Sequence, residues 1–380
     1  MKAPGVEIEL NGLDGLNPLG YLAALGALCV AHRTGEREAR LKWTRQATWR
    51  PVLTGLALTE RGELCRQMAA VLRGKDVPEE ADKIRAAAKS VFEVAKTCVK
   101  DKRVEIQKRK LDKQERATAL EQELAPLEAE REIRREEFLA ALRVAVPSPE
   151  LALGQRIDCT SDEYRSHAED SFRDAGSRNR DAIDLLAAFA NESVTDRGKV
   201  VPTPFCFITG SGHQFFLETV RQLMALVTPE RIAEALFEAW RYRDEKLSMR
   251  WDPMDNRQYA LLDRDPTAAD NRSQTVWMAN LLAYRSLCLF PLVMQRGALA
   301  ATGWSLSRED RPWQWTWPIW EFPIGIDCVR SLLQLRELQE ARPDHARLRA
   351  LGVSAVFRAS RIKVGQGANF KLNFTPARGV

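Results

Sequence analysis

The chain has 380 residues, 45% of them hydrophobic and 29% charged, with a formal net charge of +5 at pH 7. This apolar content is ordinary for a folded soluble protein of two or three domains, and no segment is long and apolar enough to cross a bilayer. The mild excess of basic residues permits a nucleic-acid partner but does not require one.

The seven cysteines are odd in number and scattered, and no two of them form a Cys-x-x-Cys pair. This spacing excludes a zinc ribbon and argues against a disulfide framework. An acidic segment and no basic leader precedes the first apolar run, so a signal peptide is not expected. We therefore expect a cytoplasmic protein with reduced thiols, and no motif calls for a metal or another cofactor.

Residues 9–33 form the most apolar long run of the chain. Asn17 and Pro18 are typical of a helix start, because asparagine caps free N–H groups and proline gives up a donor that has no partner there. The run is then apolar on every side, which predicts a buried central helix. Gly20 and Gly26 weaken a helix, so we expect them to let another backbone come close.

Residues 78–146 are interpreted as an inserted long helical hairpin or coiled coil, because apolar residues recur there at heptad-like spacing among many charges. Pro126 is expected to kink or break the helix. The rest of the chain is then an N-terminal α/β part, 1–77, and a main α+β part, 147–380. The predicted fold class is α+β and predominantly helical, with short strands at both ends.

Two basic clusters accompany this organisation. The middle of the insertion, residues 100–113, holds seven basic and three acidic residues, among them Lys108, Arg109 and Lys110. It is either a charged, solvated helix face or a basic arm that lies along a phosphate backbone. The second cluster lies in a polar, loop-like stretch and contains Arg173, Arg178 and Arg180.

A glycine loop with the sequence TGSGH, residues 209–213, follows an apolar run and precedes an amphipathic helix. A helix start after such a loop can offer backbone N–H groups to a phosphate, with Ser211 beside them. The loop is neither a P-loop nor a dinucleotide fingerprint, and a tight turn explains it as well. Ser211 and His213 are not expected to act as a nucleophile and its base.

Four aspartates lie between arginines in residues 247–265, namely Asp252, Asp255, Asp263 and Asp265. They are either ligands of a metal-dependent nuclease or Asx turns with salt bridges to the neighbouring arginines. Two of these arginines, Arg250 and Arg257, are also candidates for reading base edges.

A tryptophan-rich strand is predicted near the C-terminus, where Trp313, Trp315 and Trp317 alternate and therefore share one face. Nucleic-acid bases can stack on such a face, and burial against a helix at 325–338 is the alternative.

The tail after this region is predicted to form two strands joined by a glycine turn. Arg358, Arg361 and Lys363 give it a basic character.

Several sequence blocks together resemble accessory and large-subunit proteins found with the type I-U (also called I-G) CRISPR interference genes. These blocks are LNGLDGLNPLGYLAALGALCVAHR, FITGSG, RWDPMDNRQYAL, WPIW and GVSAVFRASR, and none of them is a catalytic signature. They cover both ends and the middle of the chain and leave 78–146 unmatched. The resemblance implies a subunit of a crRNA-guided surveillance complex, either the large subunit that recognises the target-adjacent motif and recruits the helicase-nuclease, or an accessory subunit.

The predicted function is therefore a non-catalytic subunit of a Cascade-like type I effector complex, with crRNA, target DNA, the other subunits and the helicase-nuclease as partners and no membrane association. The alternatives are a coiled-coil interaction scaffold of the same defence system and a metal-dependent nuclease. The candidate nucleic-acid-binding residues are Lys108, Arg109, Lys110, Arg173, Arg178, Arg180, Ser211, Arg250, Arg257, Arg358, Arg361 and Lys363.

Overall fold

A computed structural model describes residues 6–58, 60–175, 180–208, 215–256, 274–295, 297–305, 313–364 and 371–380. The chain is mixed α/β, with many helices and several small antiparallel sheets. It divides into two compact units: a core unit, Met1–Gly74 with Gln155–Val380, and a helical unit, Lys75–Gly154. The insertion expected at 78–146 falls within the helical unit.

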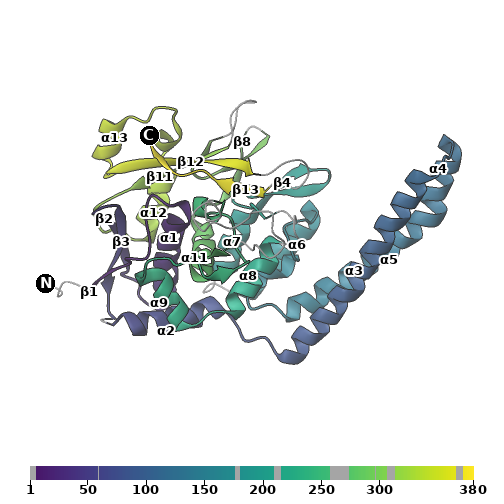
Figure 1. Ribbon diagram of the computed structural model, residues 1–380, viewed down its shortest axis with the longest axis horizontal. Coiled ribbons are helices and arrows are strands. Elements are labelled where there is room, and N and C mark those ends of the chain that lie inside the picture. The colour runs from purple at the N-terminus through teal and green to yellow at the C-terminus, as the bar shows by residue number, and fades with distance from the viewer. Residues whose placement is uncertain are drawn as a thin grey trace. The chain divides into compact units, whose positions relative to one another are not determined.

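Helix α1, Pro18–Arg33, is the central helix of the core unit, as the sequence predicted. The Asn17 side chain accepts hydrogen bonds from the backbone N–H groups of Leu19 at 2.9 Å and Gly20 at 3.4 Å, so it caps the helix in the expected way. Every residue from 18 to 31 is buried. The helix packs on α11, Trp277–Arg285, and on the 3-10 turn that continues it, Ser286–Leu289 (Figure 1).

Two sheets flank α1. The N-terminal sheet has the order β1-β3-β2, with strands Val6–Glu9, Trp49–Leu56 and Arg40–Arg45. The C-terminal sheet has the order β10-β11-β12-β13, and β14 also pairs with β12. All these pairings are antiparallel, and the strands of the C-terminal sheet are Trp304–Ser305, Gln314–Ile319, Ala355–Val364, Lys371–Phe374 and Arg378–Gly379.

An aromatic core joins α1 to the two sheets. Tyr21 of α1 stacks on Trp43 of β2 with ring centroids 5.3 Å apart, and it also contacts Trp315 and Trp317 of β11. Trp315 and Trp317 are fully buried and stack on each other at 4.6 Å. The alternation of these tryptophans was therefore a sign of burial, and these two rings are not available to nucleic-acid bases.

The remaining elements of the core unit surround this centre. They comprise helices α2, α6, α7, α8, α9, α12 and α13 and short antiparallel strand pairs β4-β5, β6-β7 and β8-β9. The helices are Arg61–Arg73, Ser161–Ala175, Asp181–Phe189, Phe216–Ala225, Pro229–Phe237, Ile326–Leu333 and His345–Ala350, and the strands are Ala190–Asp196, Lys199–Pro202, Asp244–Glu245, Gln274–Thr275, Leu292–Gln295 and Ala298–Ala301.

The helical unit contains α3, Glu79–Lys108, α4, Lys113–Ala119, and α5, Ala125–Val144. Helices α3 and α5 lie side by side (Figure 1). Phe92 of α3 stacks on Phe138 of α5, with ring centroids 5.9 Å apart. A five-residue π-helical segment, Leu120–Leu124, separates α4 from α5. Pro126, the second residue of α5, has no N–H for the α-helical ladder, so the helix is irregular at the place where the proline was expected to kink or break it.

Helices in the described ranges all lack the combination of length and apolar character that a membrane span requires.

Candidate nucleic-acid interface

The predicted residues lie at several separate places. Lys108 ends α3, and Arg109 and Lys110 follow it. Arg173 is near the end of α6, Arg180 precedes α7, and Arg250 lies in the non-helical stretch between β6 and the 3-10 turn Pro253–Asn256. Strand β12 carries the last three, Arg358, Arg361 and Lys363. Arg178, Ser211 and Arg257 lie outside the described residues.

The basic residues in the middle of the helical unit form ion pairs with acidic residues, and the sequence alone did not predict these pairs. Arg109 contacts both Glu105 and Glu123, the latter at 2.6 Å. These hydrogen bonds, Glu123 first, raise the pKa of its guanidinium. Lys102 and Arg103 also pair with glutamates, the latter with Glu128 of α5. The described contacts thus favour a charged, solvated face, while Lys108 and Lys110 remain exposed to solvent.

Arg173 and Arg180 are mostly exposed and pair with aspartates that lie three residues earlier and four residues later in the sequence, respectively. Arg173 contacts Asp170 at 2.9 Å, and Arg180 contacts Asp184 at 3.5 Å. Such short-range surface pairs contribute little to stability and leave the arginines free to exchange partners. The contacts therefore neither favour nor oppose a role in binding.

Arg358 differs from the expected exposed phosphate contact, because its side chain is only 5% exposed. Its Nε donates to Thr316 Oγ1 at 2.8 Å, and its Nη2 donates to the carbonyl oxygens of Leu338 at 3.3 Å and Glu340 at 2.7 Å. Burial and the neighbouring Arg378 lower its pKa. Arg358 is thus a buried cation held by neutral protein oxygens, which the count of basic residues in the tail could not reveal.

The other face of β12 carries Arg361 and Lys363, since alternate residues of a strand point to the same side. Arg361 lies over the ring of Phe207 at 5.6 Å and donates to the Pro204 carbonyl oxygen at 2.9 Å. Desolvation lowers the pKa of this guanidinium. Lys363 is exposed at the start of the β12-β13 pairing, opposite Leu372.

Lys371 lies on the neighbouring strand directly opposite Val364, so it is on the other face of the sheet from Arg361 and Lys363 but close to them along the strands. Partial desolvation and the charge of Arg250 lower the pKa of the Lys371 ammonium. Arg250 itself is only 6% exposed and has a left-handed φ of 63°. We call Arg250, Arg361, Lys363 and Lys371 the β12-β13 cation group. Arg250, Arg361 and Lys363 are three of the nucleic-acid-binding candidates predicted from the sequence, and Lys371 is a further basic residue of the same tail.

The aspartate-rich stretch is described only in part. Asp252 is fully buried and accepts hydrogen bonds from Asn17 Nδ2, Tyr242 Oη and the backbone N–H of Met254, each at 2.9 Å. The contact with Met254 is the Asx turn of the second alternative. No cluster of three or more potential metal-binding side chains occurs in the ranges that the structure describes, and Asp263 and Asp265 lie outside them.

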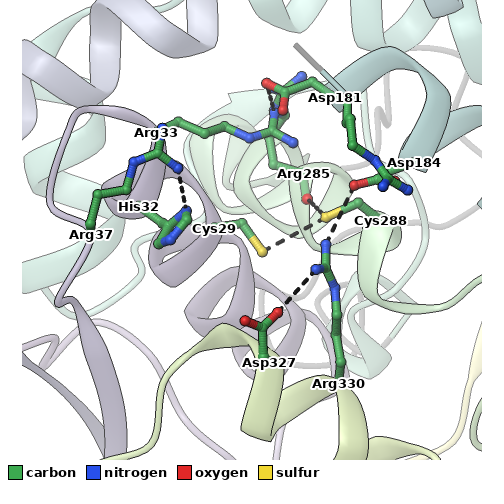
Figure 2. A network of polar contacts seen from close by, with 11 residues as sticks. Cys29, His32, Arg33, Arg37, Asp181, Asp184, Arg285, Cys288, Asp327 and Arg330 are labelled. Atoms are coloured by element: carbon green, nitrogen blue, oxygen red, sulfur yellow. Dashed lines mark hydrogen bonds and ion pairs between the residues drawn. The ribbon is translucent and has the colours of Figure 1, made fainter. Parts of the chain in front are cut away.

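A polar network that the sequence did not predict lies at the end of α1 (Figure 2). Asp181 of α7 contacts Arg33 of α1 and also Arg285 of α11, the latter at 3.3 Å. Arg330 of α12 bridges Asp184 at 3.4 Å and Asp327 at 3.3 Å. These ion pairs link four helices that are far apart in the sequence.

Two free thiols, Cys29 and Cys288, lie within this network with their sulfur atoms 3.8 Å apart (Figure 2). The contact with Cys288 and burial raise the pKa of the Cys29 thiol well above its ordinary value. A high pKa keeps the Cys29 sulfur protonated at neutral pH, whereas the same contact lowers the pKa of the Cys288 thiol. His32 contacts Arg37 and provides no base for a thiol in this arrangement. The ion pairs between the four helices fit a structural role for this network.

No protein-family model matches the chain, and no curated protein is significantly similar to it.

Proposed function

We propose that this chain is a non-catalytic, nucleic-acid-binding subunit of a crRNA-guided type I CRISPR effector complex. The observation that supports nucleic-acid binding is the β12-β13 cation group. Within the described residues, neither Arg361 nor Lys371 has a carboxylate partner, whereas most cations of the helical unit do. Cations such as Arg361 and Lys371, which no described carboxylate neutralises, attract a polyanion such as a nucleic-acid backbone.

The sequence blocks that resemble type I-U (I-G) subunits support the choice of system. RWDPMDNRQYAL contributes Arg250, and GVSAVFRASR contributes Arg361. The proposed partners are therefore crRNA, target DNA, the other effector subunits and the helicase-nuclease, in the cytoplasm. In such a complex base pairing supplies the sequence specificity, and protein cations hold the backbone.

We further propose that α3 and α5 form an inserted helical hairpin of coiled-coil type. A second candidate function is an interaction scaffold, and the apolar side chains that are exposed on α3 favour it. Ile84 is 55% exposed, Val91 48% and Val94 62%. Residues spaced by three and seven positions share one face of a helix and suit contact with a helix of another subunit.

The nuclease alternative has the least support. The described contacts of Asp252 are all made to protein donors, which is what a structural Asx turn requires. A direct check is to incubate the purified protein with labelled DNA and magnesium, because cleavage would restore the nuclease hypothesis.

Salt titrations test nucleic-acid binding and its location. The affinity of the wild type for labelled RNA and duplex DNA should fall steeply with salt concentration, because phosphate contacts release counterions. The double variant Lys363→Ala/Lys371→Ala should lower the slope on duplex DNA by up to about 2. The matched control, Lys108→Ala/Lys110→Ala, removes two exposed lysines of the helical unit and should change the slope much less.

The outcomes separate the candidates. A slope that changes only in the control variant would move the interface to the helical unit. Absence of salt-dependent binding, with retention of a partner subunit at high salt, would support the scaffold. Sequencing of RNA that copurifies from cells tests the CRISPR assignment, since crRNA repeats should be enriched.

A further inference from the structure

A second basic site lies on the opposite face of β12 from Arg361, around the buried guanidinium of Arg358. A surface pocket of about 400 Å³ is lined there by Arg342, His345, Arg358 and Arg378, together with Ala341, Pro343, Gly379 and Val380. Three arginines and a histidine thus border one hollow. This pocket is separate from the β12-β13 cation group.

Two of the arginines are held against each other by the sheet. Arg358 and Arg378 are directly opposite on the antiparallel strands β12 and β14. Like charges in directly opposed positions destabilise a sheet unless an opposite charge lies between or beside them. The register therefore places two positive charges next to each other, and we would expect a nearby carboxylate to offset their repulsion.

The described carboxylates nearby do not supply that compensation. Glu337 is paired with Arg347 at 2.7 Å, and the Asp344 side chain caps α13 by accepting from the N–H groups of Ala346 and Arg347. Glu340 accepts a hydrogen bond from Arg358 through its backbone carbonyl oxygen, and Glu340 does not line the pocket.

The cations themselves are otherwise unneutralised. Among the residues that the structure describes, the side chains of Arg342, His345 and Arg378 have no ion pair. Arg358 has hydrogen bonds only to neutral oxygens. A buried cation without a counter-ion is costly, so this arrangement is more stable with an anion bound.

The guanidinium of Arg358 is also preorganised. Contacts to Thr316, Leu338 and Glu340 hold it in one orientation from three directions. Arg342 and Arg378 are exposed at the rim, where they can close over a ligand. Planar guanidinium groups match the oxygen geometry of phosphate, and a fixed group loses little entropy on binding.

We infer that this pocket binds the terminal phosphate of a nucleic-acid strand. A terminal phosphate monoester carries nearly two negative charges at neutral pH, whereas each phosphodiester in a strand carries one. Several converging cations in one hollow therefore suit the strand end better than its interior. The identification of the ligand as a nucleic acid rests on the proposed function, while the anion site itself rests on the pocket.

The test compares three RNA oligonucleotides of the same sequence, carrying a 5′-phosphate, a 3′-phosphate or only hydroxyl ends, each labelled internally. The wild type should bind one phosphorylated form at least about tenfold more tightly than the hydroxyl form, as expected for charge-assisted hydrogen bonds. The variant Arg342→Ala/Arg378→Ala should bind all three alike. Arg349→Ala is the control, because Arg349 is exposed on α13 outside the pocket and should preserve the preference.

Two further results keep the inference separate from the proposed function. Lys363→Ala/Lys371→Ala should weaken all three oligonucleotides together while keeping the preference for the phosphate end. If no RNA binds at all, the proposed function fails, and thermal melting in inorganic phosphate still tests the pocket: phosphate should raise the melting temperature of the wild type more than that of Arg342→Ala/Arg378→Ala. Equal affinity of the wild type for all three RNA ends overturns the terminal-phosphate assignment. Equal thermal shifts in phosphate overturn the anion site.

Discussion

Gly26 of α1 packs so closely on Leu282 of α11 that a Cβ atom at position 26 would lie 1.7 Å from the carbonyl oxygen of Leu282. No side-chain rotation can relieve that contact, because both groups belong to backbones inside packed helices. The absence of a side chain at Gly26 therefore sets the distance between the two central helices of the core unit.

Gly26→Ala should consequently destabilise the protein by about 3 kcal/mol, since overpacking against a backbone forces the helices apart. Urea unfolding followed by tryptophan fluorescence measures this loss. Gly62→Ala is the matched control, because the nearest atom to a Cβ there is the end of the Arg66 side chain at 3.7 Å. The control should be neutral or stabilise by about 0.5 kcal/mol. Equal effects of the two substitutions would contradict the close packing.

The sequence predicted part of this relationship. The Asn-Pro start and the apolar run identified α1, and its two glycines indicated a close backbone approach. The partner could not be predicted, because Gly26 and Leu282 meet only through the tertiary fold. The same holds for Tyr21, whose contacts with Trp43 and Trp315 join three distant segments.

The candidate site was less predictable than the fold. Basic residues in β12 were easy to recognise, but the sequence does not tell which face of a strand is buried when both faces carry mixed residues. Arg358 and Arg361 are three positions apart and point to opposite faces, with different partners. The ion pairs of the helical unit could not be predicted for a related reason, because their partners are distant in sequence. Glu123 of the π-helical segment contacts Arg109, and Glu128 of α5 contacts Arg103.

Asn17 is expected to stabilise the core unit in two ways. Its side chain caps α1, and its amide donates to the buried carboxylate of Asp252 at 2.9 Å. Asn17→Ala should cost about 1 kcal/mol for the cap and a further 1–3 kcal/mol, roughly, for the lost donor to Asp252. Asn17→Ser retains a capping oxygen but is too short to reproduce the amide, so it should lie between the wild type and the alanine variant. Identical unfolding free energies for Ser and Ala would show that the cap contributes nothing.

Asp252 should make stability depend on pH in a defined direction. Burial raises the pKa of its carboxyl group above the ordinary value of 3.8. At pH values between the ordinary pKa of the unfolded state and the raised pKa of the folded state, the folded protein holds a proton that the unfolded protein has released. The contribution of Asp252 to stability therefore falls as pH rises through that interval. Asp252→Asn removes the titration.

Urea unfolding at a series of pH values from 4 upward tests this assignment. The free energy of unfolding of the wild type, measured relative to Asp252→Asn, should decrease as pH rises. Asp181 and Asp244, whose pKa values burial also raises, are present in both proteins and cancel in the difference. A difference that is constant with pH, or that increases with pH, would contradict the raised pKa of Asp252.

The helical unit should be removable without unfolding the core unit. It has an apolar cluster of its own, formed by Val99, Ile106, Ala119 and Leu124. None of these residues belongs to the aromatic core around Tyr21. Replacement of residues 75–154 by a short Gly/Ser linker should therefore leave a protein that melts cooperatively, because the buried residues of the core unit are all retained.

The matched control replaces residues 61–73 of α2 by a similar linker. That helix contributes Leu64, Met68 and Leu72, which are at most 1% exposed, so its loss should abolish cooperative melting. Calorimetry and circular dichroism of both deletion proteins provide the comparison. If the protein without 75–154 melts non-cooperatively, the two units depend on each other for folding. If it melts cooperatively and keeps the wild-type salt dependence of RNA binding, the nucleic-acid interface lies on the core unit, as the β12-β13 cation group predicts.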